Sequence, residues 1–214
     1  METKIVVFDM DNTLIDSKRK LQTDVVEAMG RLGAYITPEE VRGDWYALAE
    51  SFGLNKKDFD RKLGKRKTWY DALRDGDVPI FRDTLKCLDD LYDEGATLAL
   101  LTRSNQEYTR AKIDHFGLER YFQDRVEITP VKSKNGKHPE ARNLIHRLNP
   151  SPESEIYFIG DRLEDVEVVD SIRDSYQLNT NGIYLQRSEG EFPKGTERYH
   201  QVRSLEEVPR IILK

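Results

Sequence analysis

Short apolar runs alternate with helical patterns along most of this chain, and this alternation limits the fold more than any other feature. These runs are mostly apolar and cover residues 4–8, 97–101, 126–128, 156–159 and 182–185. Short continuous apolar runs are typical of strands buried on both faces, as in parallel sheets. Helical patterns between them predict strand–helix–strand connections. We therefore expect an α/β fold with a Rossmann-like, doubly wound parallel sheet.

The helices of this core are predicted from apolar spacing and from glycine or proline stops. Gly95 and Gly117 each follow a helical pattern, and Pro139 stands at the start of another. Glycine commonly ends helices, and proline is favoured in their first turn. The predicted helices cover residues 83–93, 106–116, 139–148, 163–172 and 205–212.

One long segment interrupts the alternation directly after the first strand. From Leu21 to about Leu73 the apolar residues recur at helical spacing, and no strand pattern is visible. Residues 75–79 contain glycine and proline and are typical of a linker. We expect an α/β core domain of residues 1–16 and 79–214, with residues 17–78 inserted as a small helical cap domain.

Composition excludes several classes of protein. The chain has 214 residues, with 34 Lys and Arg against 39 Asp and Glu, for a net charge of −5. This balance argues against generic nucleic-acid binding. No apolar run approaches the ~20 residues of a membrane-spanning helix, and no secretory signal is visible. The single cysteine, Cys87, favours a core position in a reducing, cytoplasmic setting.

Polar residues follow the predicted strands at several points. Ligands of open parallel sheets bind outside the carboxyl ends of the strands, so these side chains are expected to meet at one edge. They are Asp9 and Asp11 after the first strand; Thr102, Ser104 and Asn105 after the second; Asp161 and Asp165 after the fourth; and Lys132, Lys134 and Lys137 before the helix at Pro139.

Several carboxylates in one crevice repel one another unless a cation lies between them. Oxygen ligands favour a hard divalent cation, which predicts Mg²⁺ as the cofactor. Mg²⁺ with a lysine and a hydroxyl is a suitable clamp for phosphate oxygens. One carboxylate can attack phosphorus, and a second can protonate the leaving group and later activate water.

In this order the motifs resemble those of the haloacid dehalogenase superfamily, in its phosphoglycolate-phosphatase-like branch. The resemblance extends from the first strand to about Leu185. Each motif alone has a simpler explanation, namely a turn carboxylate, a helix cap or a solvated loop lysine, but four in the correct order favour the family. The motifs are residues 9–14, 100–105, 137–140 and 158–165.

The resemblance implies a role for each matching residue. Asp9 would be the nucleophile and a metal ligand. Asp11 would be the general acid and base, and would offer its backbone carbonyl to the metal. Asp161 would bind Mg²⁺, with Asp165 as a ligand through water or as support. Thr102 and Lys137 would bind the phosphoryl group, with Arg103, Ser104 and Asn105 as further substrate-binding residues.

Two positions depart from the family pattern. Asn12 stands where glycine is commoner, and asparagine tolerates a similar turn. The family usually shows lysine-proline-x-proline, whereas this chain has Lys137-His138-Pro139. Lys137 is the preferred phosphate-binding lysine on this spacing, with Lys132 and Lys134 as the alternatives.

We therefore expect a phosphoric monoester hydrolase that acts on a small phosphorylated metabolite through an aspartyl-phosphate. A phosphotransferase or mutase would use the same residues, and a phosphate-binding signalling module would hold the group without turnover. Dehalogenase chemistry is disfavoured because it needs neither Asp11 nor Asp161. The basic segment 56–67 is either a solvated helix face or an attraction site for anions.

Overall fold

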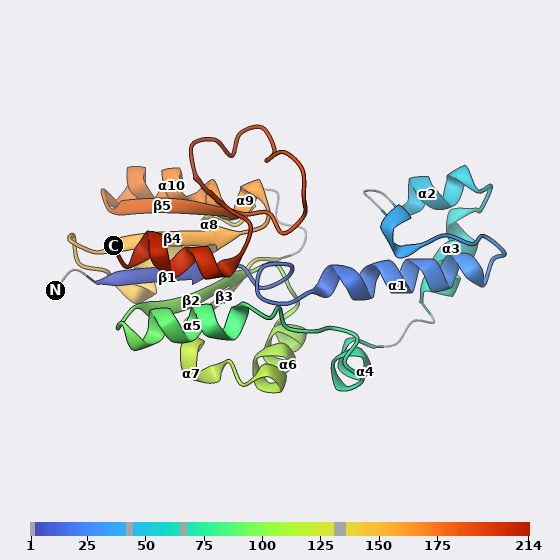
Figure 1. Cartoon of the computed structure of the whole chain (residues 1–214), viewed down its shortest axis with the longest axis horizontal. Helices are drawn as coiled ribbons and strands as arrows, with labels where there is room; N and C mark the ends of the chain where they lie inside the picture. Colours follow the sequence, from blue (N-terminus) through green and yellow to red (C-terminus); the bar gives the residue numbers. More distant parts are fainter. Residues whose placement is uncertain (1–2, 42–44, 65–67, 131–135) are drawn as a thin grey trace. The chain divides into compact units, whose positions relative to one another are not determined.

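A parallel sheet is the centre of the structure, a computed structural model that describes residues 3–41, 45–64, 68–130 and 136–214. Within those residues there are six strands, and every neighbouring pair is parallel. Their order is β3-β2-β1-β4-β5-β6, that of a Rossmann-like doubly wound sheet. The predicted fold class is confirmed (Figure 1). The strands are β1 (Lys4–Phe8), β2 (Thr97–Thr102), β3 (Val126–Ile128), β4 (Glu155–Gly160), β5 (Asn179–Leu185) and β6 (His200–Val202).

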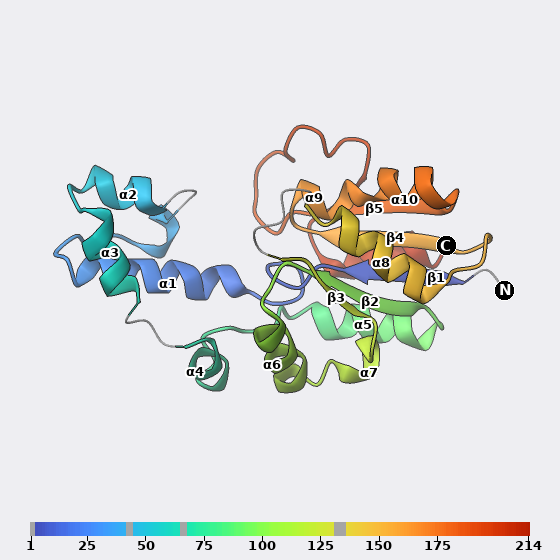
Figure 2. The ribbon, with the colours of Figure 1, turned by 180° about the vertical axis from the view of Figure 1, so that it is seen from behind.

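Helices cover both faces of this sheet. On the face turned to the viewer in Figure 1 lie α5 (Thr84–Asp93) and the red terminal helix α11 (Val208–Ile212). The opposite face carries α8 (His138–Leu148), in front of the sheet in Figure 2, and α10 (Val168–Tyr176), which contacts α8. Two further helices, α6 (Gln106–Phe116) and α7 (Glu119–Phe122), follow β2, and α9 (Leu163–Val166) follows β4.

Burial on both faces explains why the central strands are continuous apolar runs. In β1, Ile5 and Val7 pack into the core beneath α8 and α10. Val6 and Phe8 are equally buried and point to the other face, because successive side chains of a strand alternate. Phe8 meets Phe122 of α7 edge-on, with ring centroids 6.5 Å apart. A one-residue slip of β1 would exchange the side chains of its two faces and disrupt the packing on both.

A second compact unit, residues Asp16–Pro79, is inserted between Met1–Ile15 and Ile80–Lys214. Its described part is helical and has its own core, which includes Val25, Met29, Phe59 and Leu63. Its elements are α1 (Ser17–Gly30), the 3₁₀ turn η1 (Pro38–Glu40), α2 (Trp45–Ser51), α3 (Lys56–Leu63) and α4 (Trp69–Arg74). No helix in the described part of either unit is long and apolar enough to cross a membrane.

The basic segment lies partly in α3, an amphipathic helix. Phe59 and Leu63 point into the core of the inserted unit. Arg61 is exposed and pairs with Asp58 at 2.7 Å. Lys65, Arg66 and Lys67 lie outside the described residues.

Four core elements differ from the sequence predictions, and one of them is the short helix α7, which lies outside every predicted helix. The helix expected at 163–172 is divided into α9 and α10, and the one expected at 205–212 begins as a 3₁₀ turn, η2 (Leu205–Glu207). Strand β6 was not predicted. It is a three-residue edge strand of which only Val202 is buried. An edge strand this short has no apolar run to reveal it, because most of its side chains face water.

Candidate active site

The carboxyl ends of β1, β2 and β4 meet at one edge, and Asp9 lies there directly after β1. Its backbone N–H donates to the carbonyl of Ile159 in β4 at 2.8 Å, which extends the parallel pairing by one residue. The Asp9 side chain is buried. The turn that follows is tight: Asn12 has φ of +65° and donates its N–H to Ile15 O at 2.7 Å. Asparagine tolerates this left-handed conformation better than most residues.

Lys137 reaches the same point from the beginning of α8. Its Nζ lies 2.5 Å from Oδ1 of Asp9 and 2.7 Å from Oδ1 of Asp165. It also donates to the backbone carbonyl of Leu101, at the end of β2, at 2.7 Å. The side chain is 2% exposed. Burial would lower the pKa of Lys137, but the carboxylates of Asp9 and Asp165 outweigh it and raise that pKa above the ordinary value.

Lys137 is therefore within reach of the expected nucleophile, as the motif spacing suggests. The alternative lysines, Lys132 and Lys134, lie outside the described residues.

Three carboxylates form the acidic part of the site. Asp9, Asp161 and Asp165 each offer an oxygen, and these oxygens lie within 4.8 Å of one another. Burial raises the pKa of Asp9 well above its usual range; Lys137 opposes this shift, and Asp165 and Asp161 add to it. Burial, followed by the charge of Asp165, raises the pKa of Asp161 to about 7. Such mutual repulsion is what a hard divalent cation relieves, so the donor set fits Mg²⁺.

Gly160 makes the approach of Asp165 to this cluster possible. A Cβ built on Gly160 would lie 2.5 Å from Cγ of Asp165 and closer still to its Cβ. Any larger residue would collide with Asp165 at the start of α9. Asp165 is held there by a hydrogen bond from the Arg162 N–H to its Oδ2 at 2.9 Å. The glycine before Asp161 in the fourth motif is therefore required because a side chain at position 160 would collide with Asp165.

The loop after β2 supplies the second group of expected residues. Thr102 is 1% exposed, and its Oγ1 accepts the N–H of Ser104 at 3.2 Å. Arg103 and Ser104 line the same pocket as Asp9 and Asp11. Asn105 is not among the residues that line this pocket. It is the N-cap of α6, and its Oδ1 accepts the N–H of Glu107 at 2.8 Å. The structure thus gives Asn105 a capping contact.

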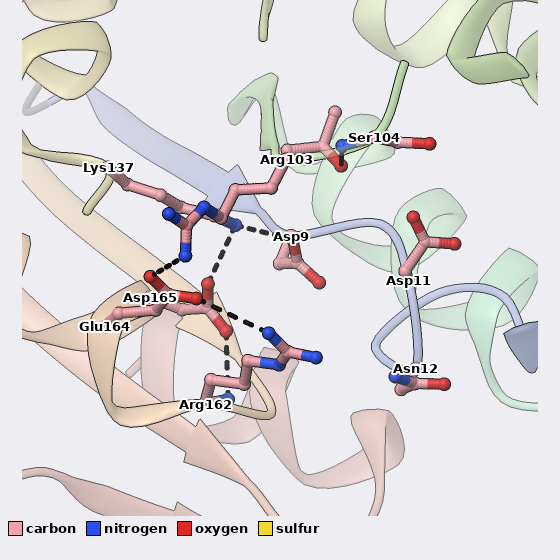
Figure 3. A pocket seen from close by; sticks show the side chains of 10 residues that line it. Asp9, Asp11, Asn12, Arg103, Ser104, Lys137, Arg162, Glu164 and Asp165 are labelled. Carbon is pink, nitrogen blue, oxygen red and sulfur yellow. Dashed lines mark hydrogen bonds and ion pairs between the residues drawn. The ribbon is translucent and has the colours of Figure 1, made fainter. Parts of the chain in front are cut away.

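The pocket at this edge has a volume of about 250 Å³, and its wall includes two arginines that pair with one glutamate. Arg103 Nη1 lies 2.6 Å from Glu164 Oε2, and Arg162 Nη1 lies 3.6 Å from Glu164 Oε1. Figure 3 shows Glu164 between the two arginines, with Asp11 set apart from the Asp9–Lys137–Asp165 group. The complete described lining is Asp9, Asp11, Asn12, Thr102, Arg103, Ser104, Lys137, Arg162, Glu164 and Asp165.

Three side chains at this site were not predicted from the sequence: Lys112, Arg162 and Glu164. Lys112 of α6 is 2% exposed, and its Nζ lies 2.5 Å from Oδ1 of Asp11. The signal for it was modest: Lys112 falls on the buried face of α6, with Thr109 and Ile113. A basic residue on an otherwise buried helix face needs a partner. The roles of Arg162 and Glu164 at the rim also had no sequence signal beyond their place in the fourth motif.

The chain matches a known protein family over most of its length. A family model described as haloacid dehalogenase-like hydrolase matches residues 6–171. Tyrosine-protein kinase PtkA of Mycobacterium tuberculosis strain H37Rv is 26% identical over 175 residues, which cover 77% of this chain and 57% of that protein. Phosphoglycolate phosphatase of Pseudomonas fluorescens strain Pf-5 is 27% identical over 180 residues, which cover 76% of this chain and 64% of that protein. Both matches thus span less than two thirds of the relative.

Solved structures share the fold over the whole chain. The crystal structure of a putative phosphatase from Clostridium difficile aligns with a TM-score of 0.75 at 18% identity, and the alignment covers 99% of each chain. The crystal structure of a phosphatase from Thermococcus onnurineus aligns with a TM-score of 0.65 at 22% identity, covering 98% of this chain and 97% of that one. At this identity the comparison establishes the fold alone.

Proposed function

This chain belongs to the haloacid dehalogenase-like hydrolase family, and on that premise we propose that it is a Mg²⁺-dependent phosphatase of a small phosphorylated metabolite. One observation carries the proposal. The buried Asp9 is held by Lys137 at 2.5 Å, while Asp11, two residues further on, has a side chain that is 30% exposed. A nucleophile must be fixed, and an acid–base group must be open to the leaving group and to water.

The proposed reaction has two steps at Asp9. A carboxylate oxygen of Asp9 attacks phosphorus in line, and the bond between phosphorus and the leaving oxygen breaks. Asp11 gives its proton to that oxygen, and the alcohol leaves. Asp11 then takes a proton from a water molecule that attacks the aspartyl-phosphate, which releases inorganic phosphate and restores Asp9. Splitting a difficult displacement into two easier ones is the general advantage of a covalent intermediate.

Other groups of the site would bind the phosphoryl oxygens. Lys137 offers an ammonium beside Asp9, and the Thr102 hydroxyl is oriented by the N–H of Ser104. These donors are fixed before substrate arrives, so they lose little entropy when negative charge moves onto the phosphoryl group. Arg103 and Ser104 at the pocket wall would complete this cradle.

The divalent cation would be held by the carboxylates of Asp9, Asp161 and Asp165, with the backbone carbonyl of Asp11 as the family resemblance implies. When bound, it would neutralise the facing carboxylates and polarise the phosphoryl group. Burial and the charges of Asp165 and Asp161 raise the pKa of Asp9, and a bound cation would offset this repulsion and favour the carboxylate form. We infer that turnover needs the cation.

Residues 16–79 form the inserted helical unit, and we propose that it acts as a cap. Its role would be to exclude bulk water during the reaction and to select the leaving group. The basic segment 56–67 would contribute to the attraction of anionic esters, and charge reversal at Arg61, Lys62 and Lys65 should then raise KM. A cytoplasmic location, where phosphorylated metabolites occur, is part of the same proposal.

A phosphotransferase is the second candidate, favoured by the kinase named among the relatives. The same Asp9 intermediate would pass its phosphoryl group to a hydroxyl other than that of water. Product analysis separates the two, because only a phosphatase releases one inorganic phosphate for each alcohol in the absence of an acceptor.

The test is hydrolysis of an aryl phosphate by the purified chain, with Mg²⁺, with chelator, and by Asp9→Asn. Asp174→Asn is the matched control, because it makes the same change at an exposed position of α10. We expect Mg²⁺-dependent turnover in the wild type and the control, and none in Asp9→Asn. Full turnover by Asp9→Asn would refute the proposal. A panel of phosphorylated metabolites would then identify the substrate, with products assayed in each case.

A further inference from the structure

A second buried ammonium approaches the site beside Lys137. Lys112 lies 2.5 Å from Oδ1 of Asp11 and 3.4 Å from the Ser104 hydroxyl, with a side chain that is 2% exposed. It therefore bridges the loop after β1 and the loop after β2. Lys112 belongs to none of the four sequence motifs.

The position of Lys112 on α6 explains how it reaches the site. The helix begins at Gln106, close behind Thr102, and Lys112 lies on its buried face. Helical side chains tilt towards the N-terminus of their own helix. The four-carbon stem of Lys112 therefore runs back along α6 towards the carboxyl edge of the sheet. A lysine is long enough to place its charge at Asp11 from there.

Burial of Lys112 has an energetic cost that a purely packing role would not require. An apolar side chain of similar length, such as methionine, would fill the same space without loss of hydration. Asp11 does not need an ammonium for its own burial, since its side chain is 30% exposed. We therefore attribute to this contact the orientation of the Asp11 side chain rather than the packing of α6.

The two ammonium groups contact different carboxylates of the site. Lys137 contacts Asp9 and Asp165, and Lys112 contacts Asp11. Figure 3 shows Asp11 standing apart from the Asp9–Lys137–Asp165 group. An acid–base carboxylate must reach the leaving oxygen, which lies on the far side of phosphorus from the nucleophile in an in-line displacement. Rotation of Asp11 towards Asp9 would remove it from that side.

We propose that Lys112 is the positioning residue of Asp11, which holds the acid–base carboxylate on the leaving-group side and away from Asp9. This inference rests on the proposed phosphatase function. It predicts a specific failure when Lys112 is removed: phosphoryl transfer to Asp9 persists, but protonation of the leaving oxygen suffers.

The experiment compares esters whose leaving groups differ in their need for a proton. The value of kcat/KM reports the steps up to departure of the leaving group, so it isolates the acid role of Asp11. For Lys112→Met we expect kcat/KM to fall about 10–100-fold with an alkyl phosphate. With a dinitrophenyl phosphate, whose leaving group needs no proton, the same variant should stay within about threefold of the wild type.

Three variants make the comparison decisive. Arg110→Met removes an exposed cation from the same helix and should leave both esters unaffected. Lys112→Arg keeps a cation and should recover part of the alkyl-ester activity. In Asp11→Asn, adding Lys112→Met should cause no further loss, because groups that act as one unit are not additive. An equal loss on both esters, or additive losses in the double variant, would overturn the proposal.

Crystal structures of the wild type, Lys112→Met and Arg110→Met test the role of Lys112 without an activity assay. We expect the Asp11 carboxylate to leave its position in Lys112→Met alone, and an unmoved carboxylate would contradict the proposal. If Lys112→Met does not fold, Lys112→Gln replaces it in every comparison, since it keeps a polar group of similar length. Absence of turnover in the wild type would count against the phosphatase function, whereas these structures would still test Lys112.

Discussion

Lys137 Nζ lies between Oδ1 of Asp9, at 2.5 Å, and Oδ1 of Asp165, at 2.7 Å, so one buried ammonium joins two carboxylates from different strand ends. Asp9 follows β1, and Asp165 follows β4. The third contact of Lys137, to Leu101 O, reaches β2. Three neighbouring strands of the sheet are therefore connected at the site by a single side chain.

Lys137→Met should destabilise the protein as well as inactivate it. Removing one partner of a buried ion pair costs about 3–5 kcal/mol, because the other charge stays buried without compensation. The pKa of Lys137 is raised in the folded protein. The stabilisation from its ion pairs is therefore fully present below the pKa of lysine in the unfolded chain, about 10.4, and so at neutral pH. Denaturant unfolding at pH 7 measures the effect. Lys194→Met, at an exposed position, should change stability by less than about 0.5 kcal/mol, and equal stability of the two variants would contradict the argument.

Mg²⁺ should stabilise the protein more at pH 8 than at pH 6. In the metal-free protein the pKa of Asp161 is raised to about 7, so the folded state holds a proton that the unfolded chain releases near pH 4. Metal-free stability therefore falls as pH rises from about 4 to about 7. Cation binding needs the deprotonated carboxylate and reverses this loss.

Thermal unfolding with and without Mg²⁺ at the two pH values measures this difference. At a concentration 100-fold above Kd the gain is about 2.7 kcal/mol, roughly 5–10 °C in Tm. Asp161→Asn should lose most of it, and NaCl at equal ionic strength controls for screening. Equal shifts at both pH values would argue against Asp161 as a ligand.

Gly160→Ala should weaken the site through a collision with Asp165. The added Cβ would lie 2.5 Å from Cγ of Asp165, so the start of α9 must move away from the acidic cluster. Strain of this kind typically costs about 1–3 kcal/mol. We also expect weaker Mg²⁺ binding, measured by the shift in Tm on titration. Gly30→Ala is the matched control, because a Cβ at Gly30 meets no atom within 4 Å, and it should leave Mg²⁺ binding unchanged. Gly190→Ala is unsuitable because its φ of +109° would strain any other residue.

Arg187→Met should lower stability at neutral pH and matter less in acid. Arg187 pairs with Asp83 at 3.0 Å and donates to Thr13 O, in the turn between Asp11 and Ile15, at 2.6 Å. Burial raises the pKa of Asp83, but hydrogen bonds from Arg187, Ser204 and the Leu205 N–H outweigh it and hold that pKa below its ordinary value. The stabilisation is thus present above the unfolded pKa of about 3.9 and is lost as pH falls through the folded pKa.

Thermal unfolding of the wild type and Arg187→Met at pH 7 and pH 3 tests this pH dependence. The loss at pH 7 should be about 2 kcal/mol, as for a hydrogen-bonded charge, and should shrink at pH 3. Arg210→Met, at an exposed position of α11, is the matched control. A difference that stays constant or grows in acid would exclude Asp83 as the group concerned.

The general outline of the fold could be predicted from the sequence because each strand is read from a few neighbouring residues. The apolar run of β1 and the glycine stop after α6 are local features, and Gly117 indeed ends α6 in the left-handed conformation, with φ of +64°. The break between α9 and α10 was not predicted, since Leu163, Val166, Val169 and Ile172 keep one helical period across it. Strand β6 was missed because its pairing with β5 lies in the tertiary structure.

The amino-acid sequence by itself determined which residues follow the ends of β1, β2 and β4, and parallel pairing then brings Asp9, Thr102 and Asp161 to one edge. That step needs only the direction of the strands. Tertiary structure alone decided that Lys112 reaches Asp11 across 101 positions and that Arg187 reaches Asp83 across 104. It also decided that Gly160 must admit Asp165. These contacts depend on how helices and loops pack against each other, and packing distances of a few ångströms have no periodic signature along the chain.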